Sequence, residues 1–471
     1  MEFQTTFGIT SYTDTPPIPQ SFPIEETKRK LIYSPRMLQN MRLGTLIKFA
    51  KELKGKKPVD IDKIQSMGLL AVKLGQICAL RPDLLEPDRC IQLQELYSRA
   101  PTIPSENFEK LLTKYTDDNF RSEFKHIEPV PFAAASIGQI HKAELKDGSK
   151  VVIKIIKGDF KKSFERDVKR MKRWMKMGLF FNPKLKKVGN PIGLLNHIED
   201  YTLRELNLLN EITGKERLEK LSAEYSDKFP MPKLRFPKIW KNLSSENVLV
   251  MEEVKEPTLE SHLNSGTMEW EDLLQLFRIH GAYMFGMGVF HGDLHPGNAM
   301  MGDDKNFIFI DTGAICEAPE HVRKALFGFF FFLAKGELKN AFDAMLTMAD
   351  VAPTGKTLQT YYDSMFELYD GFVGTSVSEV SLTQQMMKTV KAAVLAGCSF
   401  GDEAFPIIRS LMYMDGMVLK GHPNVDLISS MGPYLDEFAT LIDTSTLLES
   451  APMSSRKAVE KNPSLISKTT A

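Results

Sequence analysis

Apolar side chains recur at helical spacing in two stretches near the start of the chain, residues 31–53 and 61–80. The breaker Pro82 ends the second stretch. Residues 1–27 are rich in Thr, Pro and Ser without a period, which predicts an irregular arm. We therefore expect a helical extension over residues 28–126, ahead of any sheet.

Short β-branched runs begin at Ile127 and replace the helical period. They cover residues 127–130, 137–145 and 150–156, then 236–240 and 247–254, with helical stretches at 159–177 and 194–221 between them. The pattern predicts a small β-rich lobe with inserted helices (127–255), a helical large lobe (256–450) and a loose tail (451–471). This is the α+β plan of a bilobal protein-kinase-like fold.

The composition of the chain argues against several classes of partner and binding site. Lys plus Arg equals Asp plus Glu at 60 each, so the chain has no net charge that would attract it to nucleic acid. We therefore do not expect nucleic acid as a partner. Four scattered cysteines argue against a zinc site or a disulfide framework and indicate a reducing, intracellular compartment. The acidic N-terminus is unlike a transit peptide. The longest apolar run, residues 325–334, is far short of the ~20 residues of a membrane span, so we expect a cytoplasmic or peripheral membrane protein.

The most specific motif runs from His291 to Asn298 and has the H-x-D-x-x-x-x-N spacing of a kinase catalytic loop. Asp293 would orient or deprotonate the attacking hydroxyl, and Asn298 would hold magnesium. Asp311 ends the following apolar strand, where a carboxylate can bind the metal that bridges the phosphates of ATP or ADP. A loop that only caps a helix is the alternative interpretation.

Lys154 ends the strand Val151–Lys154, which matches the V-A-I-K pattern. Its partner would be a glutamate on a following helix, and we predict Glu205 rather than Glu199 or Glu211. A solvated glutamate on an exposed helix face is the alternative for each of the three.

Two further segments are candidate nucleotide-binding elements. Ala133, Ala134, Ala135 and Ser136 replace the glycine-rich loop, and their backbone N–H groups can still hold phosphate oxygens, although three β-carbons restrict the approach. A plain strand connector is the alternative. Glu252 and Val254 fall where a hinge would contact the nucleotide.

Lys73, Gly75 and Gln76 form a K-x-G-Q string inside the helical extension. Glycine within a helical pattern costs roughly 1 kcal/mol relative to alanine, so Gly75 predicts close approach of another backbone. Chance is the alternative for so short a string.

These motifs together resemble the UbiB-type (ADCK-like) family of atypical protein-kinase-like proteins, over about residues 61–430. The resemblance implies a kinase-like fold whose N-terminal extension packs over the cleft, an ATPase tied to isoprenoid-quinone or lipid metabolism, and peripheral membrane association. It implies a Lys154–Glu205 ion pair, Asp293 as the catalytic carboxylate, Asn298 and Asp311 as magnesium ligands, and a regulatory role for the K-x-G-Q string.

Three positions depart from the family pattern. The E-x-D motif, expected six residues before the ion-pair glutamate, reads Glu199, Asp200, Tyr201. The D-F-G motif reads Asp311-Thr312-Gly313, which loses the aromatic residue. The hinge, residues 252–257, has no glycine. These changes bear on regulation more than on nucleotide binding.

The segment after Gly313 is too short to hold a peptide substrate, because four residues separate it from the Ala318-Pro319-Glu320 string. An ATPase or a kinase of a small lipophilic or phenolic molecule is therefore expected rather than a protein kinase acting in trans. The alternatives are a phosphotransferase resembling aminoglycoside or choline kinases and a catalytically inactive nucleotide-binding scaffold.

Positive charge is concentrated between Lys154 and Lys187, where thirteen Lys or Arg face three acids. Within residues 161–176, Phe164, Val168 and Met171 recur at helical spacing among the basic residues. A basic amphipathic helix, followed here by Leu179, Phe180 and Phe181, is typical of a segment that binds anionic lipid. Packing of the apolar stripe on the small lobe is the alternative.

Overall fold

The computed structural model describes residues 41–55, 57–79, 85–98, 100–181, 191–400 and 404–442. The predicted arm (1–27), the tail (451–471) and the first part of the first predicted helix lie outside these residues. So does Pro82.

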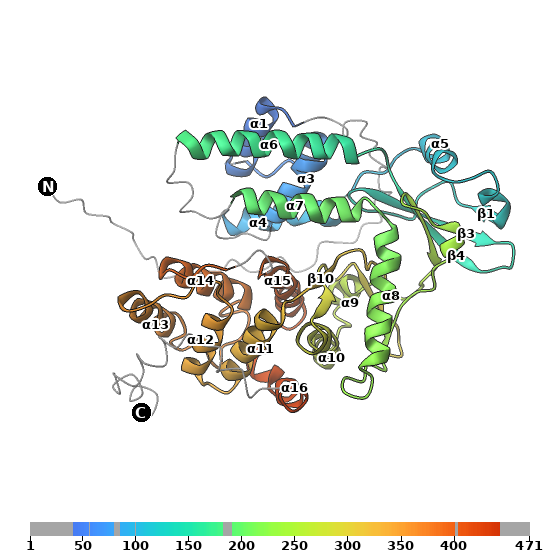
Figure 1. Cartoon of the computed structure of the whole chain (residues 1–471). Coiled ribbons are helices and arrows are strands. Elements are labelled where there is room, and N and C mark those ends of the chain that lie inside the picture. The colour runs from blue at the N-terminus through green and yellow to red at the C-terminus, as the bar shows by residue number, and fades with distance from the viewer. Residues whose placement is uncertain are drawn as a thin grey trace.

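An antiparallel sheet of five strands forms the small lobe, at the right of Figure 1. Its strands are β1 (Phe124–Ile127), β2 (Ala133–Ala134), β3 (Gly138–Leu145), β4 (Lys150–Ile156) and β6 (Val248–Glu252), in the order β1-β3-β4-β6 with β2 paired to β3. β3 and β4 pair in continuous register from Gly138 opposite Ile156 to Glu144 opposite Lys150. The predicted hairpin is confirmed.

Alternation along β4 gives its two faces different neighbours. Val151, Ile153 and Ile155 are fully buried and pack against α5 (Ser105–Tyr115). Val152 and Ile156 belong to the core of the helical layer on the other side. Because side chains alternate, Lys154 lies on this second face, between the sheet and the helices.

Helices from two parts of the chain form that layer, at the top of Figure 1. They are α1 (Leu43–Lys54), α2 (Ile61–Ser66), α3 (Leu69–Ala79), α4 (Pro87–Ser98), α6 (Lys161–Phe181) and α7 (Pro191–Glu205). The predicted helix at 61–80 is two helices, because Gly68 between them has a φ of 102°. The predicted helix at 194–221 is also divided, into α7 and α8 (Leu209–Glu224).

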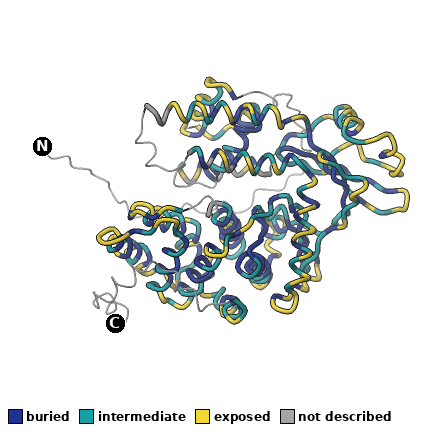
Figure 2. Tube along the Cα trace, in the orientation of Figure 1, coloured by how far each residue is buried: buried dark blue, intermediate teal, exposed yellow. Residues whose placement is uncertain are grey.

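The large lobe is mostly helical, as predicted. It contains α9 (Leu259–Ser265), α10 (Trp270–Gly281), a π-helix (Ala282–Met287), α11 (Glu320–Ala334), α12 (Leu338–Thr347), α13 (Lys356–Leu368), α14 (Leu382–Leu395), α15 (Ala404–Gly421) and α16 (Leu427–Leu441). The apolar run of α11 lies in its core, where Phe327, Phe329 and Phe330 are buried. Figure 2 shows how buried segments (dark blue) gather inside this lobe. Among the described helices, none has both the length and the apolar character of a membrane span.

Two small sheets frame the loops between the lobes. β7 (Val289–His291) pairs with β10 (Ile315–Glu317), and β9 (Phe307–Phe309) lies between β5 (Leu234–Arg235) and β8 (Ala299–Met301). The strand predicted at 236–240 is wrong in extent, since only Leu234 and Arg235 form a strand and Ile239 makes a single bridge to Met251.

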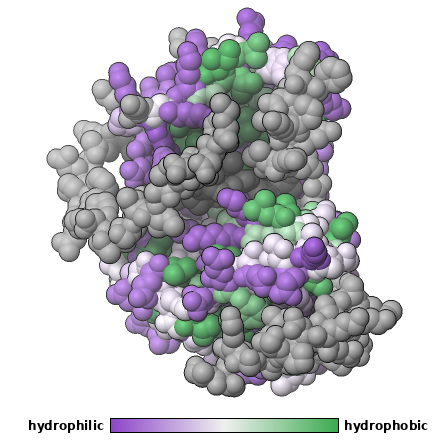
Figure 3. Space-filling model, turned by 90° about the vertical axis from the view of Figure 1, so that its left-hand side faces the viewer, coloured by the Kyte–Doolittle hydropathy of each residue, from purple (hydrophilic) through white to green (hydrophobic). Residues whose placement is uncertain are grey.

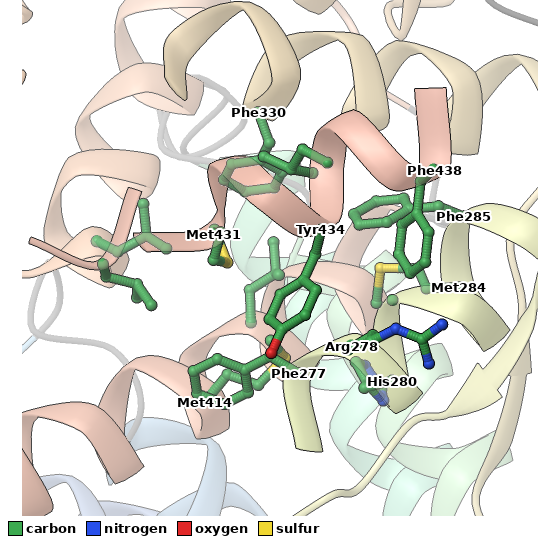
Figure 4. Close-up of a pocket in the computed structure, with 15 residues that line it drawn as sticks. Phe277, Arg278, His280, Met284, Phe285, Phe330, Met414, Met431, Tyr434 and Phe438 are labelled. Atoms are coloured by element: carbon green, nitrogen blue, oxygen red, sulfur yellow. The ribbon is translucent and has the colours of Figure 1, made fainter. Parts of the chain in front are cut away.

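An apolar cavity lies inside the large lobe between α10, α15 and α16 (Figure 4). Rings and thioethers such as Phe277, Phe438 and Met431 line it. Its charged neighbour Arg278 is already paired with Glu437, at 2.9 Å through Nε. A lining made almost wholly of apolar side chains suits neither phosphate nor Mg²⁺, and the predicted phosphate-binding residues border a different cavity.

α8 approaches the loop after β9 more closely than a side chain would allow. A β-carbon built on Gly214 would lie 2.0 Å from the carbonyl oxygen of Thr312 and 2.8 Å from Cγ1 of Ile315. Thr312 also donates a hydrogen bond through Oγ1 to the carbonyl of Glu211, at 2.7 Å. Glycine at 214 therefore sets the distance between α8 and Asp311.

We predict that Gly214→Ala lowers the free energy of unfolding by about 1–3 kcal/mol or more, and with it the melting temperature. The added methyl group would overlap backbone atoms, which cannot move aside as a flexible side chain could. Helix propensity alone would give about 1 kcal/mol in the opposite direction. Gly416→Ala, in α15 with nothing within 4 Å of the added carbon, is the matched control and should be neutral or stabilising. Equal thermal melting of the two variants would contradict this packing.

Candidate nucleotide and metal site

The catalytic loop connects β7 to β8 and is fixed at its start by His291. This ring is buried, and its Nε2 contacts the backbone oxygen of Asp311. Its Nδ1 accepts a hydrogen bond from the backbone N–H of Asp293, at 3.1 Å. Burial lowers the pKa of His291, which favours a neutral ring. His291 thus ties the catalytic loop to Asp311, the predicted magnesium ligand.

Asp293 and Asn298 lie together, as predicted. The amide Nδ2 of Asn298 donates to the backbone oxygen of Asp293 at 3.0 Å and to its Oδ2 at 3.2 Å. This orientation uses the amide nitrogen within the loop and leaves the amide oxygen for a cation. The hydroxyl of Tyr201 also donates to Asp293 Oδ2, at 2.9 Å.

Lys154 pairs with two carboxylates. Its Nζ lies 2.5 Å from Glu211 Oε1 and 2.9 Å from Asp311 Oδ2. The predicted partner Glu205 is wrong, because Glu205 forms an ion pair with Lys73. The chain turns between α7 and α8, where Leu206 and Leu208 are buried, and this turn brings the start of α8 to β4.

Three glutamates on this segment thus pair with three different lysines: Glu199 with Lys172, Glu205 with Lys73, and Glu211 with Lys154. The six-residue spacing of the family motif was the signal that could have identified Glu211. With Glu211 as the ion-pair glutamate, the E-x-D position reads Glu205-Leu206-Asn207. The departure is therefore an amide at Asn207, and the assignment of the motif to Glu199 is corrected.

Burial and charge set the ionisation of this cluster. Burial, followed by the Asp311 charge, raises the pKa of Glu211 to about 7. Burial alone would raise the pKa of Asp311 too, but the Lys154 ammonium outweighs it and holds that pKa below its usual range. Burial would lower the pKa of Lys154, yet its two carboxylates raise it. A charged Asp311 beside a charged lysine suits a site for Mg²⁺ and phosphate.

Thr312 explains how the chain dispenses with the aromatic residue of the D-F-G motif. It is buried, and its hydroxyl bonds the first turn of α8. The backbone N–H of Gly313 lies 3.3 Å from Asp311 Oδ1 and orients that carboxylate. A hydrogen bond therefore holds α8 on this loop.

The alanine-rich loop is held from below by a lysine that the sequence did not indicate. Lys157 Nζ donates to the carbonyl oxygens of Ala135, at 2.6 Å, and Pro101, at 2.7 Å. Burial lowers its pKa to about 7. Ala135 and Ser136 border one cavity with Lys154, Asp293 and Asp311, whereas Ala133 and Ala134 pair with β3. A second lysine three residues after Lys154 was the available signal.

At the predicted hinge, the Glu252 carboxylate is bound by Arg235 Nη1, at 3.0 and 3.3 Å. It also accepts from the backbone N–H of Lys238 at 3.0 Å. The backbone N–H of Glu252 is also bonded, to the carbonyl of Lys238 at 2.8 Å, and nucleotide contact by Glu252 and Val254 remains a prediction.

The K-x-G-Q string lies in α3. Lys73 is buried, and Gln76 Nε2 donates to the carbonyl of Leu96 in α4, at 3.0 Å. A β-carbon on Gly75 would lie 2.5 Å from Leu96 Cδ1, so the predicted close neighbour is a side chain and not a backbone.

Arg409 is a buried residue of the site, and it begins the stretch of residues 409–423, the last part of the chain that carries the family resemblance. Its Nε donates to the carbonyl of Gly292, at 3.0 Å, and its guanidinium lies 4.3 Å from the Tyr201 ring centre. Asp415, from the same stretch, serves a different purpose. It accepts hydrogen bonds from Ser381 Oγ and from the backbone N–H groups of Leu382 and Thr383, and so fixes the start of α14.

Comparison with known families identifies the chain. Residues 95–345 match the model of the ABC1 atypical kinase-like domain. The chain belongs to the ABC1 atypical kinase-like family. This confirms the resemblance to UbiB-type and ADCK-like proteins.

Its relatives include "Protein ACTIVITY OF BC1 COMPLEX KINASE 3, chloroplastic" of Arabidopsis thaliana, 27% identical over 395 residues, which cover 80% of this chain and 53% of that protein. "Probable protein kinase UbiB" of Erwinia tasmaniensis is 24% identical over 435 residues, which cover 89% of this chain and 74% of that protein. The chain thus spans about half the length of the Arabidopsis relative.

Among solved structures, a complex of Rv3197 with erythromycin from Mycobacterium tuberculosis matches with a TM-score of 0.51 at 20% identity. The match covers 83% of this chain and 95% of that chain. At this identity the likeness supports the kinase-like fold.

We predict that Glu211→Gln weakens the stabilisation of the chain by Mg-ADP, because Lys154 loses one of its two anionic partners. Glu205→Gln, a matched change six residues earlier, should preserve that stabilisation, since Glu205 pairs with Lys73. Thermal melting with and without Mg-ADP separates the two variants. Loss in Glu205→Gln and retention in Glu211→Gln would restore the original assignment.

Proposed function

We propose that this chain binds Mg-ATP and acts as an ATPase or phosphotransferase on a small molecule. The observation that carries the proposal is one cavity bordered by Lys154, Glu211, Asp293 and Asp311, with Asn298 bonded to Asp293. Asp311 and the Asn298 amide oxygen would hold Mg²⁺, which when bound neutralises charge on the phosphates. Lys154 would orient a phosphate, and Asp293 would accept the proton of the attacking hydroxyl or water.

Two observations support a small-molecule substrate: the short segment after Gly313 and the names of the relatives. The segment after Gly313 passes directly into β10 and then α11, which leaves little room for a peptide substrate. Lys73 and Gln76 of α3 border a cavity with Tyr201 and Arg409. In Figure 1, α3 belongs to the layer that lies above the large lobe. The relatives named UbiB support a role in isoprenoid-quinone or lipid metabolism, with a small lipophilic or phenolic acceptor. Nucleic acid is not expected.

The two alternatives differ from this proposal in measurable ways. The helical layer that holds Lys73 and Gln76 speaks against a phosphotransferase resembling aminoglycoside or choline kinases. An inactive scaffold would bind nucleotide without turnover, whereas the hydrogen bond between Asn298 and Asp293 supports a working catalytic loop.

Purified chain should therefore release ADP from Mg-ATP, and Asp293→Asn should slow this release about a hundredfold or more, because a positioned acid or base contributes at least that factor. Asp311→Asn should remove the magnesium-dependent thermal stabilisation by nucleotide. Stabilisation of the parent by Mg-ADP without any ADP release from Mg-ATP would favour the inactive scaffold instead.

Anionic lipid is a second proposed ligand, and the structure changes the argument for it. The apolar stripe of α6 does not face outward, because Phe164, Val168 and Met171 are buried against the other helices of the layer. The side chains of Leu179, Phe180 and Phe181 lie outside those the structure describes. The idea that α6 inserts its apolar stripe is therefore corrected.

What remains is charge on the outer side of α6. Its exposed basic residues are Lys161, Lys162, Arg166, Lys169, Arg173 and Lys176. In the side view of Figure 3, hydrophilic side chains (purple) flank a hydrophobic patch (green) at the top of the molecule, the end at which this layer lies. The proposed contact is electrostatic.

Reversal of Lys162, Arg166 and Lys169 to Glu should weaken binding to anionic vesicles about a hundredfold, at about 1 kcal/mol per cation removed. The control reverses three exposed lysines of the large lobe, Lys356, Lys388 and Lys391, and should bind like the parent. Co-sedimentation with anionic and neutral vesicles at two salt concentrations measures the effect. Equal pelleting of both variants, or no pelleting of the parent, would contradict the proposal.

A further inference from the structure

Tyr201 of α7 contacts Asp293, the predicted catalytic aspartate. Its hydroxyl donates to Asp293 Oδ2 at 2.9 Å. The same side chain borders the cavity that contains Lys154 and Asp311, where the phosphates of the nucleotide are proposed to bind. In phosphoryl transfer by kinases, the acceptor hydroxyl is the group that gives its proton to this aspartate. Tyr201 is thus arranged as an acceptor hydroxyl supplied by the chain itself.

The Tyr201 hydroxyl stays protonated unless a base accepts its proton. Burial, followed by the charge of Asp293, raises the pKa of Tyr201 well above its ordinary value. A phenol in this state needs a carboxylate in contact to accept the proton as the new bond forms, and Asp293 is in contact.

Two buried cations lie beside the ring. The Arg409 guanidinium is 4.3 Å and the Lys73 ammonium is 5.3 Å from the ring centre, and the two residues are only 7% and 4% exposed. Lys73 is paired with Glu205, whereas Arg409 is in an ion pair with no carboxylate of the described residues. Burial would lower the pKa of Arg409, but the nearby Tyr201 and Asp293 outweigh it and raise that pKa. An anion placed beside the ring would add the direct ion pair that this guanidinium lacks among the described residues. A phosphate on Tyr201 would bring about −1.5 to −2 charges to this place.

We propose that Tyr201 is an internal phosphoryl acceptor, modified by the same chain that carries it. The Tyr201 oxygen attacks the γ-phosphorus of ATP, the bond from that phosphorus to the oxygen bridging to the β-phosphate breaks, and ADP leaves with the electron pair. The phenolic proton goes to Asp293. This inference rests on the proposed use of Mg-ATP.

Phosphorylation of Tyr201 would change the residues with which its side chain interacts. A phosphorylated Tyr201 can no longer donate to Asp293, and its negative charge is repelled by that carboxylate. Arg409 and Lys73 stand beside the ring to pair with the phosphate, in the bidentate manner that guanidinium and phosphate favour. Asp293 is then free for another acceptor.

The test uses the full chain, first treated with a tyrosine phosphatase and then incubated with Mg-ATP. ADP release and phosphate at Tyr201 are measured in the same reaction, the latter by tandem mass spectrometry. We expect phosphate on Tyr201 with a rate constant that does not change with chain concentration, as an internal reaction requires. Tyr201→Phe should lose the phosphotyrosine signal, and Tyr434→Phe, a control in the large lobe, should retain it.

An Asp293→Asn chain added to the parent reports on transfer between molecules and should stay unmodified at Tyr201. ADP release from a parent that remains unphosphorylated at Tyr201 would overturn the inference and leave the proposed function intact. Phosphate on the added Asp293→Asn chain would overturn the internal route. A parent that releases no ADP and carries no phosphate would overturn the inference together with the proposed function.

Discussion

The close packing of α8 on the Asp311–Gly313 loop is the constraint on which the site depends. Gly214 leaves no room for a β-carbon there, and Thr312 bonds the carbonyl of Glu211 one turn earlier on the same helix. Because both contacts are to backbone, the position of Glu211 relative to Asp311 is fixed without help from the sheet. β4 then brings Lys154 between the two carboxylates. The distance between α8 and this loop thus determines how Lys154 is held between its two carboxylates.

Ion pairs extend this arrangement into the helical layer. Glu199, Glu205 and Glu211 join α6, α3 and β4 respectively to one continuous stretch of chain. The second of these pairs lies beside Tyr201, whose hydroxyl is bonded to Asp293. Side chains in contact therefore connect the helical layer to Asp293 without passing through the sheet.

The catalytic loop was predictable from sequence because its chemistry is local. Asp293 and Asn298 lie five residues apart and hydrogen-bond each other, so the motif and the geometry coincide. The partner of Lys154 was not predictable in this way, since it depends on the turn at Leu206 and Leu208, which helical periodicity does not reveal. Likewise, α6 has the same amphipathic period whether its apolar stripe meets lipid or other helices. The bond from Tyr201 to Asp293 spans 92 residues and leaves no local signal.

The central claim is that Lys154, Asp311 and Asn298 form one site for a metal–nucleotide complex. An experimental structure of the full chain with Mg-ADP tests it most directly. The account predicts magnesium bound to a carboxylate oxygen of Asp311 and the amide oxygen of Asn298, with a phosphate oxygen at Lys154 Nζ, which remains paired with Glu211. Nucleotide bound elsewhere, or magnesium that contacts neither Asp311 nor Asn298, would contradict it.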